Sequence, residues 1–391
     1  MMAVAFLKDQ SLGRILAGHP WVYTKDILKV EKAPEDGGEI VVRRQDGGYV
    51  ATGFYNSKSR IPVRIFSRAK EHLDDALLAR RIQEAHALRQ KWCGDKLPEA
   101  YRAIWSEADF LPGLIVDRYG DATVFQTLTL GMEQRKKEIV RSLRDLFSPT
   151  TLIERNDVGS REYEGLTQTK QLLFGEASVK SVVMGKVRME IDLVEGQKTG
   201  SYLDQIANHV AVGEISRGRR VLDCFTYHGG FALHAAKAGA ASVEAWDISE
   251  PAIEACRRNS KLNDLPSIQW KAVNVFDELN ARQKSHAPYD LIVLDPPSFT
   301  RSRAKLDDAL RGYKEIHLRA LKLLPPGGLL ATFCCSHHVD AETFRAVVLD
   351  AAFDARKMLR WRRAYFQSWD HPVLPAIPET EYLKGFLFEV V

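Results

Sequence analysis

The pattern that most constrains this chain is an alternation of short apolar strands with helical stretches after about residue 186. Four runs, RRVLDCF, SVEAWD, DLIVLD and GLLATFCC, are typical of buried strands, and stretches of about ten or more residues with helical spacing separate them. Strands that alternate with helices form parallel sheets covered by helices on both faces. The sequence therefore predicts a doubly wound α/β domain over residues 186–391.

The chain before residue 186 divides into two further parts. Its first part contains short alternating apolar stretches broken by Gly and Asp, such as GGEIVVRRQDGGYVATGFYN and IPVRIFS, which are strand and hairpin signals. From Leu73 to Leu88 the apolar residues follow one face of a helix, and strands then alternate with a second helix. We therefore predict a β-rich domain over residues 1–70, a central α+β domain over residues 71–185 and the doubly wound domain over residues 186–391.

Composition places the chain among soluble globular proteins. Of its 391 residues, 45% are hydrophobic and 27% charged, and no run approaches the ~20 apolar residues of a membrane span. The start, MMAVAFLKDQ, lacks the pattern of a signal peptide, and five scattered cysteines without metal-site spacing suit a reducing compartment. We therefore predict a cytoplasmic protein. A net charge of +4 with local clusters such as RKMLRWRR permits nucleic-acid binding without establishing it.

Polar residues end the predicted strands of the doubly wound sheet, at the edge where such sheets bind ligands. The first strand ends at Asp223 to Phe225, and Gly229, before the next helix, lets the backbone approach a ligand closely. The second strand ends at Asp247, where a carboxylate can accept both hydroxyl protons of a ribose. The glycines do not form the fingerprint of a dinucleotide site. The pattern therefore indicates a nucleoside without a pyrophosphate.

Asn274 adds a polar group for an adenine edge, and Val275 and Phe276 can line the adenine face. S-adenosylmethionine fits such a pocket, and its amino-acid end would need polar partners such as Asp223 and the loop EGQKTGSYLDQ, residues 195–205. A single Asp at a strand end is as readily a helix cap or a turn residue. Four polar strand ends in register favour a cofactor pocket instead.

The segment DLIVLDPPSF, residues 290–299, ends its strand with Asp295, where a planar substrate would meet the methyl group. In enzymes that methylate amino groups, an acidic or amide residue here accepts hydrogen bonds from the target nitrogen, and no thiol is needed. Carbon-5 of cytosine is instead a poor nucleophile until a thiolate adds to carbon-6. Asp295 can hydrogen-bond the ring nitrogen and amino group of such a cytosine, which would stabilise the charge that develops.

Two adjacent cysteines, Cys334 and Cys335, end the last of the four strands within LLATFCCSHH, residues 329–338. A cysteine in a strand is ordinarily a small core residue. Side chains alternate between the two faces of a strand, so only one of the pair is expected to face the pocket. We predict that His337 and His338 are loop or surface residues rather than catalytic bases.

These motifs resemble those of a known family, the bacterial 23S ribosomal RNA cytosine-carbon-5 methyltransferases that carry an N-terminal PUA domain. The resemblance covers nearly the whole chain and includes GHPWVY, DFLPGLIVDRYGD, EGQKTGSYLDQ, DCFTYHGGFA, LDPPSF, TFCCSH and HPVLPAIPETEYLKGF. It implies a class I methyltransferase domain, S-adenosylmethionine as donor, a flipped-out rRNA cytosine as substrate and Cys335 as nucleophile. The cofactor-binding residues that it implies are Thr199, Gly200, Asp204, Asp223, Phe225, Gly229, Asp247, Asn274 and Asp295.

The sequence departs from that family at several positions. Ser298 stands where Lys often follows the two prolines, which removes a cation from beside the thiol. Asn274 stands where Asp is common, and Cys334 where Ser is common. Pro297 fills the position that holds a second thiol in the two-cysteine RNA methylases. The base that removes the carbon-5 proton is therefore unassigned.

The resemblance gives the front domains a role in holding RNA. The expected partners are 23S rRNA or a precursor of the large subunit, with a second copy of the chain as a further candidate and no membrane. A base inside a duplex is out of reach, so the target must be single-stranded or extruded. Arg14, His19, Trp21 and Tyr23 are candidates for the RNA surface, although aromatic residues in a small β domain are more often core residues.

Two other functions fit part of the sequence. A guanine nitrogen would be methylated with the same donor, and Cys335 would then be dispensable. A noncatalytic RNA-binding or ribosome-assembly factor could retain the fold, because a fold alone does not fix a function. The intact set of cofactor motifs argues against the noncatalytic alternative.

Overall fold

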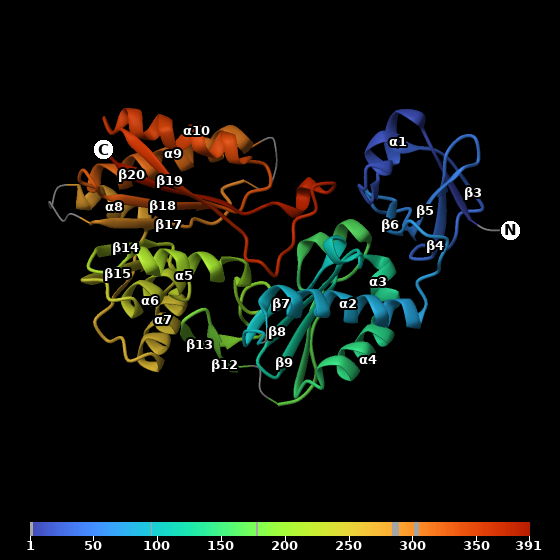
Figure 1. Ribbon diagram of the computed structural model, residues 1–391, viewed down its shortest axis with the longest axis horizontal. Coiled ribbons are helices and arrows are strands. Elements are labelled where there is room, and N and C mark those ends of the chain that lie inside the picture. The colour runs from blue at the N-terminus through green and yellow to red at the C-terminus, as the bar shows by residue number, and fades with distance from the viewer. Residues whose placement is uncertain (1–2, 95, 177–178, 284–288, 301–304) are drawn as a thin grey trace. The chain divides into compact units, whose positions relative to one another are not determined.

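The computed structural model describes residues 3–94, 96–176, 179–283, 289–300 and 305–391, and these form two compact units. The first unit contains the chain up to Val182, together with Ile191–Leu203 and Trp369–Thr380. The second contains Val183–Glu190, Asp204–Ser368 and Glu381–Val391. Figure 1 follows the chain by colour through both. The domain boundaries near residues 70 and 185 stay predictions.

A six-stranded sheet forms the front of the first unit, in the order β2-β6-β5-β4-β1-β3. Its strands are β1 (Val4–Leu7), β2 (Trp21–Val22), β3 (Ile27–Glu31), β4 (Glu39–Arg43), β5 (Tyr49–Tyr55) and β6 (Val63–Ser67), and the helix α1 (Asp9–Leu16) follows β1. Alternate side chains from these strands fill a core that includes Leu7, Val42 and Val63, each fully buried. These strands confirm the prediction that the first part of the chain is rich in β structure.

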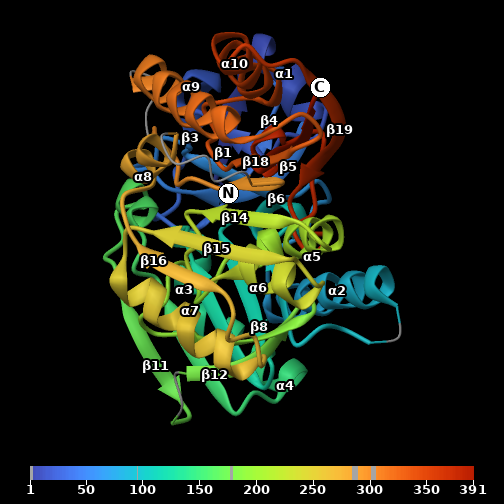
Figure 2. The same cartoon turned by 90° about the vertical axis from the view of Figure 1, so that its left-hand side faces the viewer.

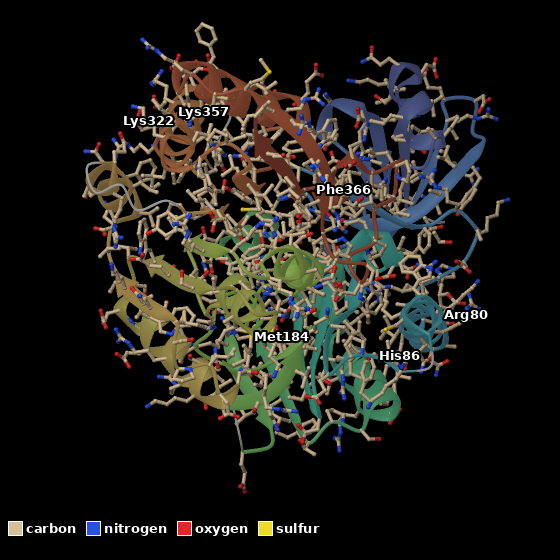
Figure 3. All side chains as sticks on the ribbon, turned by 60° about the vertical axis from the view of Figure 1, so that its left-hand side comes forward. Arg80, His86, Met184, Lys322, Lys357 and Phe366 are labelled. Atoms are coloured by element: carbon tan, nitrogen blue, oxygen red, sulfur yellow. The ribbon has the colours of Figure 1, made fainter. Side chains whose placement is uncertain are left out.

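A five-stranded sheet in the order β11-β10-β9-β8-β7 follows it in the same unit. Its strands are β7 (Ala100–Trp105), β8 (Leu114–Tyr119), β9 (Ala122–Thr127), β10 (Thr151–Arg155) and β11 (Lys170–Phe174), and its helices are α2 (Asp75–Cys93), α3 (Leu130–Gln134) and α4 (Lys136–Phe147). Asp74 caps α2 by accepting a hydrogen bond from the Leu77 nitrogen at 2.8 Å. Arg80 and His86 of α2 are labelled in Figure 3.

The apolar stripe predicted for α2 is buried from Leu73 to Ala85, as the helical spacing required. One turn later the buried position is taken by Arg89, whose guanidinium pairs with Asp109 at 2.5 Å and donates to the Arg102 carbonyl. Arg102 in turn binds both oxygens of Asp117 at 2.8 Å. Buried charges need such partners, so the core of this sheet contains two enclosed ion pairs that the periodicity did not predict.

The hairpin of β12 (Val179–Met184) and β13 (Val187–Asp192) contributes Val183–Glu190 to the second unit, and the chain belongs to the first unit again from Ile191 to Leu203. The second unit is built on a seven-stranded sheet in the order β16-β15-β14-β17-β18-β20-β19. Its strands are β14 (Arg220–Cys224), β15 (Ser242–Asp247), β16 (Gln269–Ala272), β17 (Leu291–Leu294), β18 (Leu329–Cys334), β19 (Leu359–Phe366) and β20 (Lys384–Val390). The predicted parallel sheet is confirmed, since β16, β15, β14, β17 and β18 pair parallel.

Helices cover both faces of this sheet, as the doubly wound prediction requires. They are α5 (Ile206–Ile215), α6 (Gly230–Lys237), α7 (Glu250–Leu262), α8 (Val275–Arg282), α9 (Leu306–Leu323) and α10 (Ala341–Asp354). Figure 1 shows α9 and α10 on one face and α5, α6 and α7 on the other, and Figure 2 shows β14, β15 and β16 side by side. Within the described part of the chain, none of the helices is long and apolar enough to cross a bilayer.

The last two strands, β20 and β19, pair antiparallel with the sheet at the β18 edge. The basic cluster RKMLRWRR contributes most of β19, the outermost strand, and most of its side chains there are exposed. Arg360 and Arg362 both pair with Glu389 of the neighbouring strand. The single carboxylate of Glu389 is therefore shared by two arginines of the cluster.

Candidate functional site

The second unit brings the predicted strand-end residues to one edge of its sheet. Asp223 lies in β14, Asp247 ends β15, Asp295 directly follows β17 and Cys335 directly follows β18. The strands β15, β14, β17 and β18 are neighbours and parallel, so their carboxyl ends meet at the same edge. This is the edge at which doubly wound sheets bind ligands.

Asp223 is fully buried, and only one of its two carboxylate oxygens accepts hydrogen bonds from the described residues. Its Oδ2 accepts hydrogen bonds from the Thr226 hydroxyl at 2.5 Å and the Ala232 nitrogen at 3.0 Å. Among the described residues, none donates a hydrogen bond to the buried Oδ1. Burial raises the pKa of Asp223 to about 7. A buried acceptor of this kind fits a donor group on a ligand, such as the ammonium of an amino acid.

The turn between β14 and α6 requires glycine at residue 229. Gly229 has φ of +88°, and a Cβ on it would lie 2.9 Å from the ring of Trp270. Phe225, with φ of +64°, lies in the same turn, and its ring contacts that of Phe276 edge-on with centroids 6.5 Å apart. The turn therefore combines a backbone that only glycine fits with an aromatic wall suited to the face of an adenine.

Asp247 and Asn274 accept hydrogen bonds from nearby backbone nitrogens and can still bind a ligand. Asp247 accepts from the Tyr227 nitrogen at 3.0 Å and from the Ser249 nitrogen at 2.9 Å, one bond on each oxygen. Because each carboxylate oxygen has two lone pairs, both can also accept from ribose hydroxyls. Asn274 caps α8 through its Oδ1, which accepts from the Phe276 nitrogen at 2.9 Å. Its amide NH2 group, a donor, suits a ring nitrogen of adenine.

A chain of side-chain amides leads to Asp295. Asn208 donates from Nδ2 to Gln205 Oε1 at 2.7 Å and to the carbonyl of Phe366 at 2.9 Å. Phe366, the last residue of β19, is labelled in Figure 3. With its oxygen so occupied, Gln205 presents its NH2 group to Asp295 Oδ2 at 3.0 Å. Asp295 is therefore held by a donor whose orientation is itself fixed.

The two adjacent cysteines have different surroundings. Cys334 is fully buried in the core of the second unit, and its thiol donates to the Tyr313 hydroxyl at 3.4 Å. Cys335, past the end of β18, is partly exposed. All five cysteines are thiols, and burial raises the pKa of Cys334, Cys224, Cys256 and Cys93. Those four thiols are therefore poorly suited to react as thiolates.

His337 and His338, two and three residues after Cys335, are both exposed. The ring of His337 lies 5.5 Å from that of Tyr382, centroid to centroid. These are the surroundings expected of loop residues.

Three residues of the predicted cofactor set belong to the motif EGQKTGSYLDQ. Thr199 and Gly200 lie in the first unit, where the buried Thr199 hydroxyl donates to Asp117 at 2.5 Å. Gly200 has φ of +137° and closes a turn by donating its nitrogen to the Gln197 carbonyl at 2.8 Å. Asp204 lies in the second unit and accepts from the Tyr382 hydroxyl at 2.5 Å. Direct cofactor contacts by these residues stay predictions.

Three of the residues suggested for RNA contact in the front domain bind acidic side chains within the first unit. His19 is buried and pairs with Glu379 at 3.3 Å, and Arg14 pairs with Asp26 at 2.6 Å. The Trp21 indole donates to Glu107 at 2.7 Å. These contacts hold parts of the first unit together, and RNA contact by these residues stays a prediction.

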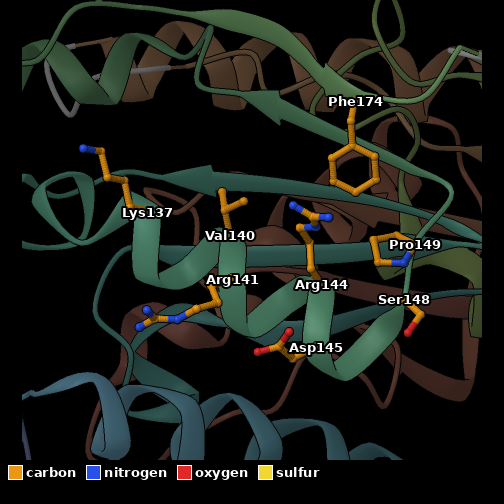
Figure 4. Close-up of a pocket in the computed structure, with 8 residues that line it drawn as sticks. All are labelled: Lys137, Val140, Arg141, Arg144, Asp145, Ser148, Pro149 and Phe174. Atoms are coloured by element: carbon orange, nitrogen blue, oxygen red, sulfur yellow. The ribbon is translucent and has the colours of Figure 1, made fainter.

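An open hollow of about 560 Å³ lies over α4 in the same unit (Figure 4). Its cations are Lys137, Arg141 and Arg144, and the guanidinium of Arg144 lies 5.2 Å from the ring centre of Phe174. Arg141 is paired with Asp75 at 2.5 Å. Sequence reasoning did not single out this surface, because its residues come from α4 and β11, which are distant along the chain.

Four residues of the second unit were also missed. Gln205 and Tyr382 bind Asp295 and Asp204 of the predicted set, Asn208 binds Gln205, and Lys384 binds the backbone that follows Cys335. Gln205 lies inside EGQKTGSYLDQ, and Tyr382 and Lys384 lie inside the quoted ending HPVLPAIPETEYLKGF. The motifs pointed to these segments but did not show which side chains meet.

Comparisons with known proteins agree with this architecture. Residues 161–356 match the model of the S-adenosylmethionine-dependent methyltransferases, and residues 6–68 match a PUA-like domain. "Ribosomal RNA large subunit methyltransferase I" of Tolumonas auensis is 36% identical over the full length of both chains. The protein of the same name from Shewanella denitrificans is 39% identical over 98% of this chain and 97% of its own.

Solved structures show the same fold over the whole chain. One, described as an S-adenosylmethionine-dependent methyltransferase from Streptococcus mutans, matches with a TM-score of 0.84 at 20% identity, covering 100% of both chains. Another methyltransferase, SMU.776 complexed with SAH, matches with a TM-score of 0.86 at the same identity and coverage.

The fold, the strand-end carboxylates and the turn at Gly229 define an S-adenosylmethionine-dependent methyltransferase that carries a PUA-like domain. Within that class, the chain belongs to the family of the ribosomal RNA large subunit methyltransferases I.

Proposed function

We propose that this protein methylates carbon-5 of a cytosine in 23S rRNA, or in a precursor of the large ribosomal subunit, through a covalent bond between Cys335 and carbon-6. The single observation that carries the proposal is the position of Cys335, a partly exposed thiol that leaves β18 beside the strand bearing Asp295. Methylation of an amino nitrogen would need Asp295 without needing a thiol there. The choice of large-subunit ribosomal RNA as the substrate rests on the names of the relatives.

The chemistry requires a nucleophile that adds and then leaves. The Cys335 thiolate attacks carbon-6, forming a sulfur–carbon bond and moving an electron pair toward carbon-5. S-adenosylmethionine, when bound, supplies the electrophilic methyl group that carbon-5 accepts. A base then takes the carbon-5 proton, the electron pair re-forms the ring double bond, and the sulfur–carbon bond breaks to return the thiolate. Asp295, held by Gln205, accepts a hydrogen bond from the cytosine amino group and, once the ring nitrogen takes up a proton during the addition, from that nitrogen as well.

The residues present fit the methyl donor. The unused Oδ1 of Asp223 would accept from the donor's ammonium group, and Asp247 would accept from both ribose hydroxyls. Asn274 would meet the adenine edge, with Phe225 and Phe276 at its face and Gly229 allowing close approach. The family resemblance also implies Thr199, Gly200 and Asp204, whose contacts with the donor stay predictions.

The RNA must present its cytosine outside a duplex, so binding has to extend beyond the reacting base. The hollow over α4 suits a phosphate backbone because Lys137, Arg141 and Arg144 line it with one acid, Asp145, and Arg144 lies over the ring of Phe174. We further propose that the protein acts in the cytoplasm, to which an odd, scattered set of thiols is suited. A homodimer remains a candidate assembly.

The proposed function is tested with RNA tritiated at carbon-5 of cytosine. We expect the protein with S-adenosylmethionine to release tritium in step with methyl transfer, and Cys335→Ala to lose both. The matched control is Cys334→Ala, which removes a buried thiol from the same strand end and should keep both activities if it folds. Methylation that survives Cys335→Ala without tritium release would show that the target is a nitrogen.

S-adenosylhomocysteine binding, measured by calorimetry, tests the enzyme class separately. Binding by the wild type and by Cys335→Ala is expected, because the thiol is not part of the cofactor set. Absence of binding to well-folded protein would instead favour the noncatalytic alternative.

A further inference from the structure

The antiparallel strand β20 places a lysine beside the cysteine pair. Lys384, the first residue of β20, is the register partner of Cys334 on β18, and on its other side of Phe366 on β19. Lys384 therefore lies at the same end of the sheet as the thiols, although about fifty residues separate it from them along the chain. Ser298, close after Asp295, uses its hydroxyl to donate to the Thr300 carbonyl and is uncharged.

The Lys384 ammonium binds the backbone that follows Cys335. It donates to the Ser336 carbonyl at 2.6 Å and to the Val339 carbonyl at 2.5 Å. An ammonium carries three protons, so these two bonds occupy two of them and tie the loop after β18 to β20. Cys335 is the residue immediately before this anchored loop, and its backbone is therefore fixed from one side by β18 and from the other by Lys384.

The Lys384 ammonium is partly buried and lies among groups that favour its positive charge. Burial lowers the pKa of Lys384, whereas Cys334, Cys335, Asp340 and Glu381 each favour its protonated form. Of the two thiols, Cys334 is buried and donates to Tyr313, while Cys335 is partly exposed. Asp295 also faces Cys334 with a negative charge that opposes ionisation. A cation is needed at this site to favour a thiolate next to that carboxylate.

We propose that Lys384 is a positioning residue for Cys335, anchoring the loop that follows it and supplying the positive charge that stabilises its thiolate. This inference rests on the nucleophilic role proposed for Cys335. The proposal gives β20 a role in the reaction, although β20 lies outside the motifs assigned to the cofactor and the substrate. Lys384→Met removes the charge and both hydrogen bonds, and Lys384→Arg keeps a cation with several donors.

The test is the rate at which iodoacetamide alkylates Cys335, followed by mass spectrometry of the Cys335 peptide across a range of pH. In Lys384→Met the midpoint of the profile should move upward by about one pH unit, so that alkylation at pH 7 falls about tenfold. Lys384→Arg should restore most of the wild-type profile. The matched control is Lys357→Met, which removes a lysine bonded to the Leu324 carbonyl at 3.1 Å in the same unit (Figure 3).

A purely structural lysine would give a different result. The plateau rate would change in Lys384→Met while the midpoint stayed at its wild-type pH, and this outcome would overturn the inference. Binding of S-adenosylhomocysteine checks that each variant is folded. If the Met variant fails that check, Lys384→Gln, which keeps an uncharged NH2 group as a donor, is measured in its place with the same expected shift.

Alkylation needs neither RNA nor a methyl donor, so it is independent of the tritium experiment. A shifted alkylation midpoint without tritium release in the wild type would support the role of Lys384 and refute carbon-5 methylation. Tritium release with an unshifted midpoint would support carbon-5 methylation and refute the role of Lys384.

Discussion

Gln205 donates a hydrogen bond from Nε2 to Asp295 Oδ2 across 3.0 Å, although ninety residues separate them in sequence. The bond joins the motif EGQKTGSYLDQ to the motif LDPPSF at the carboxyl edge of the sheet. Asn208 fixes the amide of Gln205 in the orientation that makes this bond. A carboxylate held in this way is already aligned for a substrate, so little reorganisation is required during the reaction.

Gln205→Ala should therefore slow methyl transfer. Loss of one hydrogen bond to a charged group costs about 1.5–3 kcal/mol, which corresponds to a roughly 10- to 100-fold lower single-turnover rate. S-adenosylhomocysteine affinity should change less than the rate, because this bond orients the Asp295 carboxylate that is proposed to meet the cytosine. The matched control is Gln168→Ala, which removes an exposed glutamine that also donates to a carboxylate, that of Glu162 at 2.8 Å. Equal rates for the two variants would contradict this role.

The pKa of Asp223 predicts that cofactor affinity depends on pH. Because burial raises this pKa from 3.8 to about 7, the unliganded carboxyl is largely protonated below pH 7. An ammonium ligand needs the ionised form, so affinity for S-adenosylhomocysteine should rise by up to about tenfold per pH unit below 7 and level off above it. Calorimetry in two buffers of different ionisation enthalpy should show proton release on binding at pH 6.

The same pKa fixes the sign of a stability effect. A carboxyl whose folded pKa lies above its unfolded pKa favours the folded state while it is protonated, and this contribution is lost as pH rises from about 4 to about 7. Asp223→Asn should remove that part of the pH dependence of the free energy of unfolding, measured with urea. It should also remove the pH dependence of S-adenosylhomocysteine binding and weaken the binding itself. An unchanged pH profile in the variant would show that another group titrates.

Gly229→Ala should impair cofactor binding through the turn before α6. The new Cβ would meet the Trp270 ring at 2.9 Å, in addition to the cost of a φ of +88°. Gly239→Ala is a matched control, because Gly239 has the same φ of +88° but its nearest neighbour, in the Arg217 side chain, is 3.9 Å away. Both variants should lose stability in thermal unfolding, and only Gly229→Ala should also lose affinity for S-adenosylhomocysteine. Similar losses of affinity in both would assign the effect to backbone strain alone.

The parts of the fold that follow local patterns were predictable from the sequence. The apolar run in β14 and the stripe from Leu73 to Ala85 on α2 determined a buried strand and a buried helix face by their spacing. Asp223, Asp247 and Asp295 could be assigned to one edge because parallel strands share a direction. Cys335 was chosen over its neighbour from the family resemblance, and the structure places Cys334 in the core.

Contacts between distant segments could not be predicted in this way. The pairing of β20 with β18, which brings Lys384 to the thiols, depends on antiparallel strands from the last part of the chain. The Tyr382 hydroxyl reaches Asp204 across 178 residues of sequence. In the first unit, sequence reasoning named His19 and Trp21 as candidates for an RNA surface. It could not show their acidic partners, Glu379 and Glu107, which are also distant along the chain. Periodicity reports which face of an element is buried and not which side chain lies opposite.

The hollow over α4 predicts where RNA affinity depends on charge. Replacing Lys137 and Arg144 by Gln removes two of its cations, including the guanidinium that stacks on Phe174. We expect weaker binding to every RNA sequence tested, and a log–log salt dependence that is shallower by about one for each phosphate that the variant no longer neutralises. Calorimetric S-adenosylhomocysteine binding should stay unchanged, since the cofactor set does not include these residues.

The control for this pair replaces two exposed lysines of the second unit, Lys237 of α6 and Lys261 of α7, by Gln. Both double variants lower the net charge by two, so a general effect of charge would weaken RNA binding equally in each. A loss of affinity confined to the Lys137 and Arg144 variant, with its shallower salt slope, would locate the phosphate-binding cations in the hollow. Equal losses would show that the hollow is an ordinary solvated surface, because phosphates attracted only by net charge do not distinguish between cations at different places on the protein.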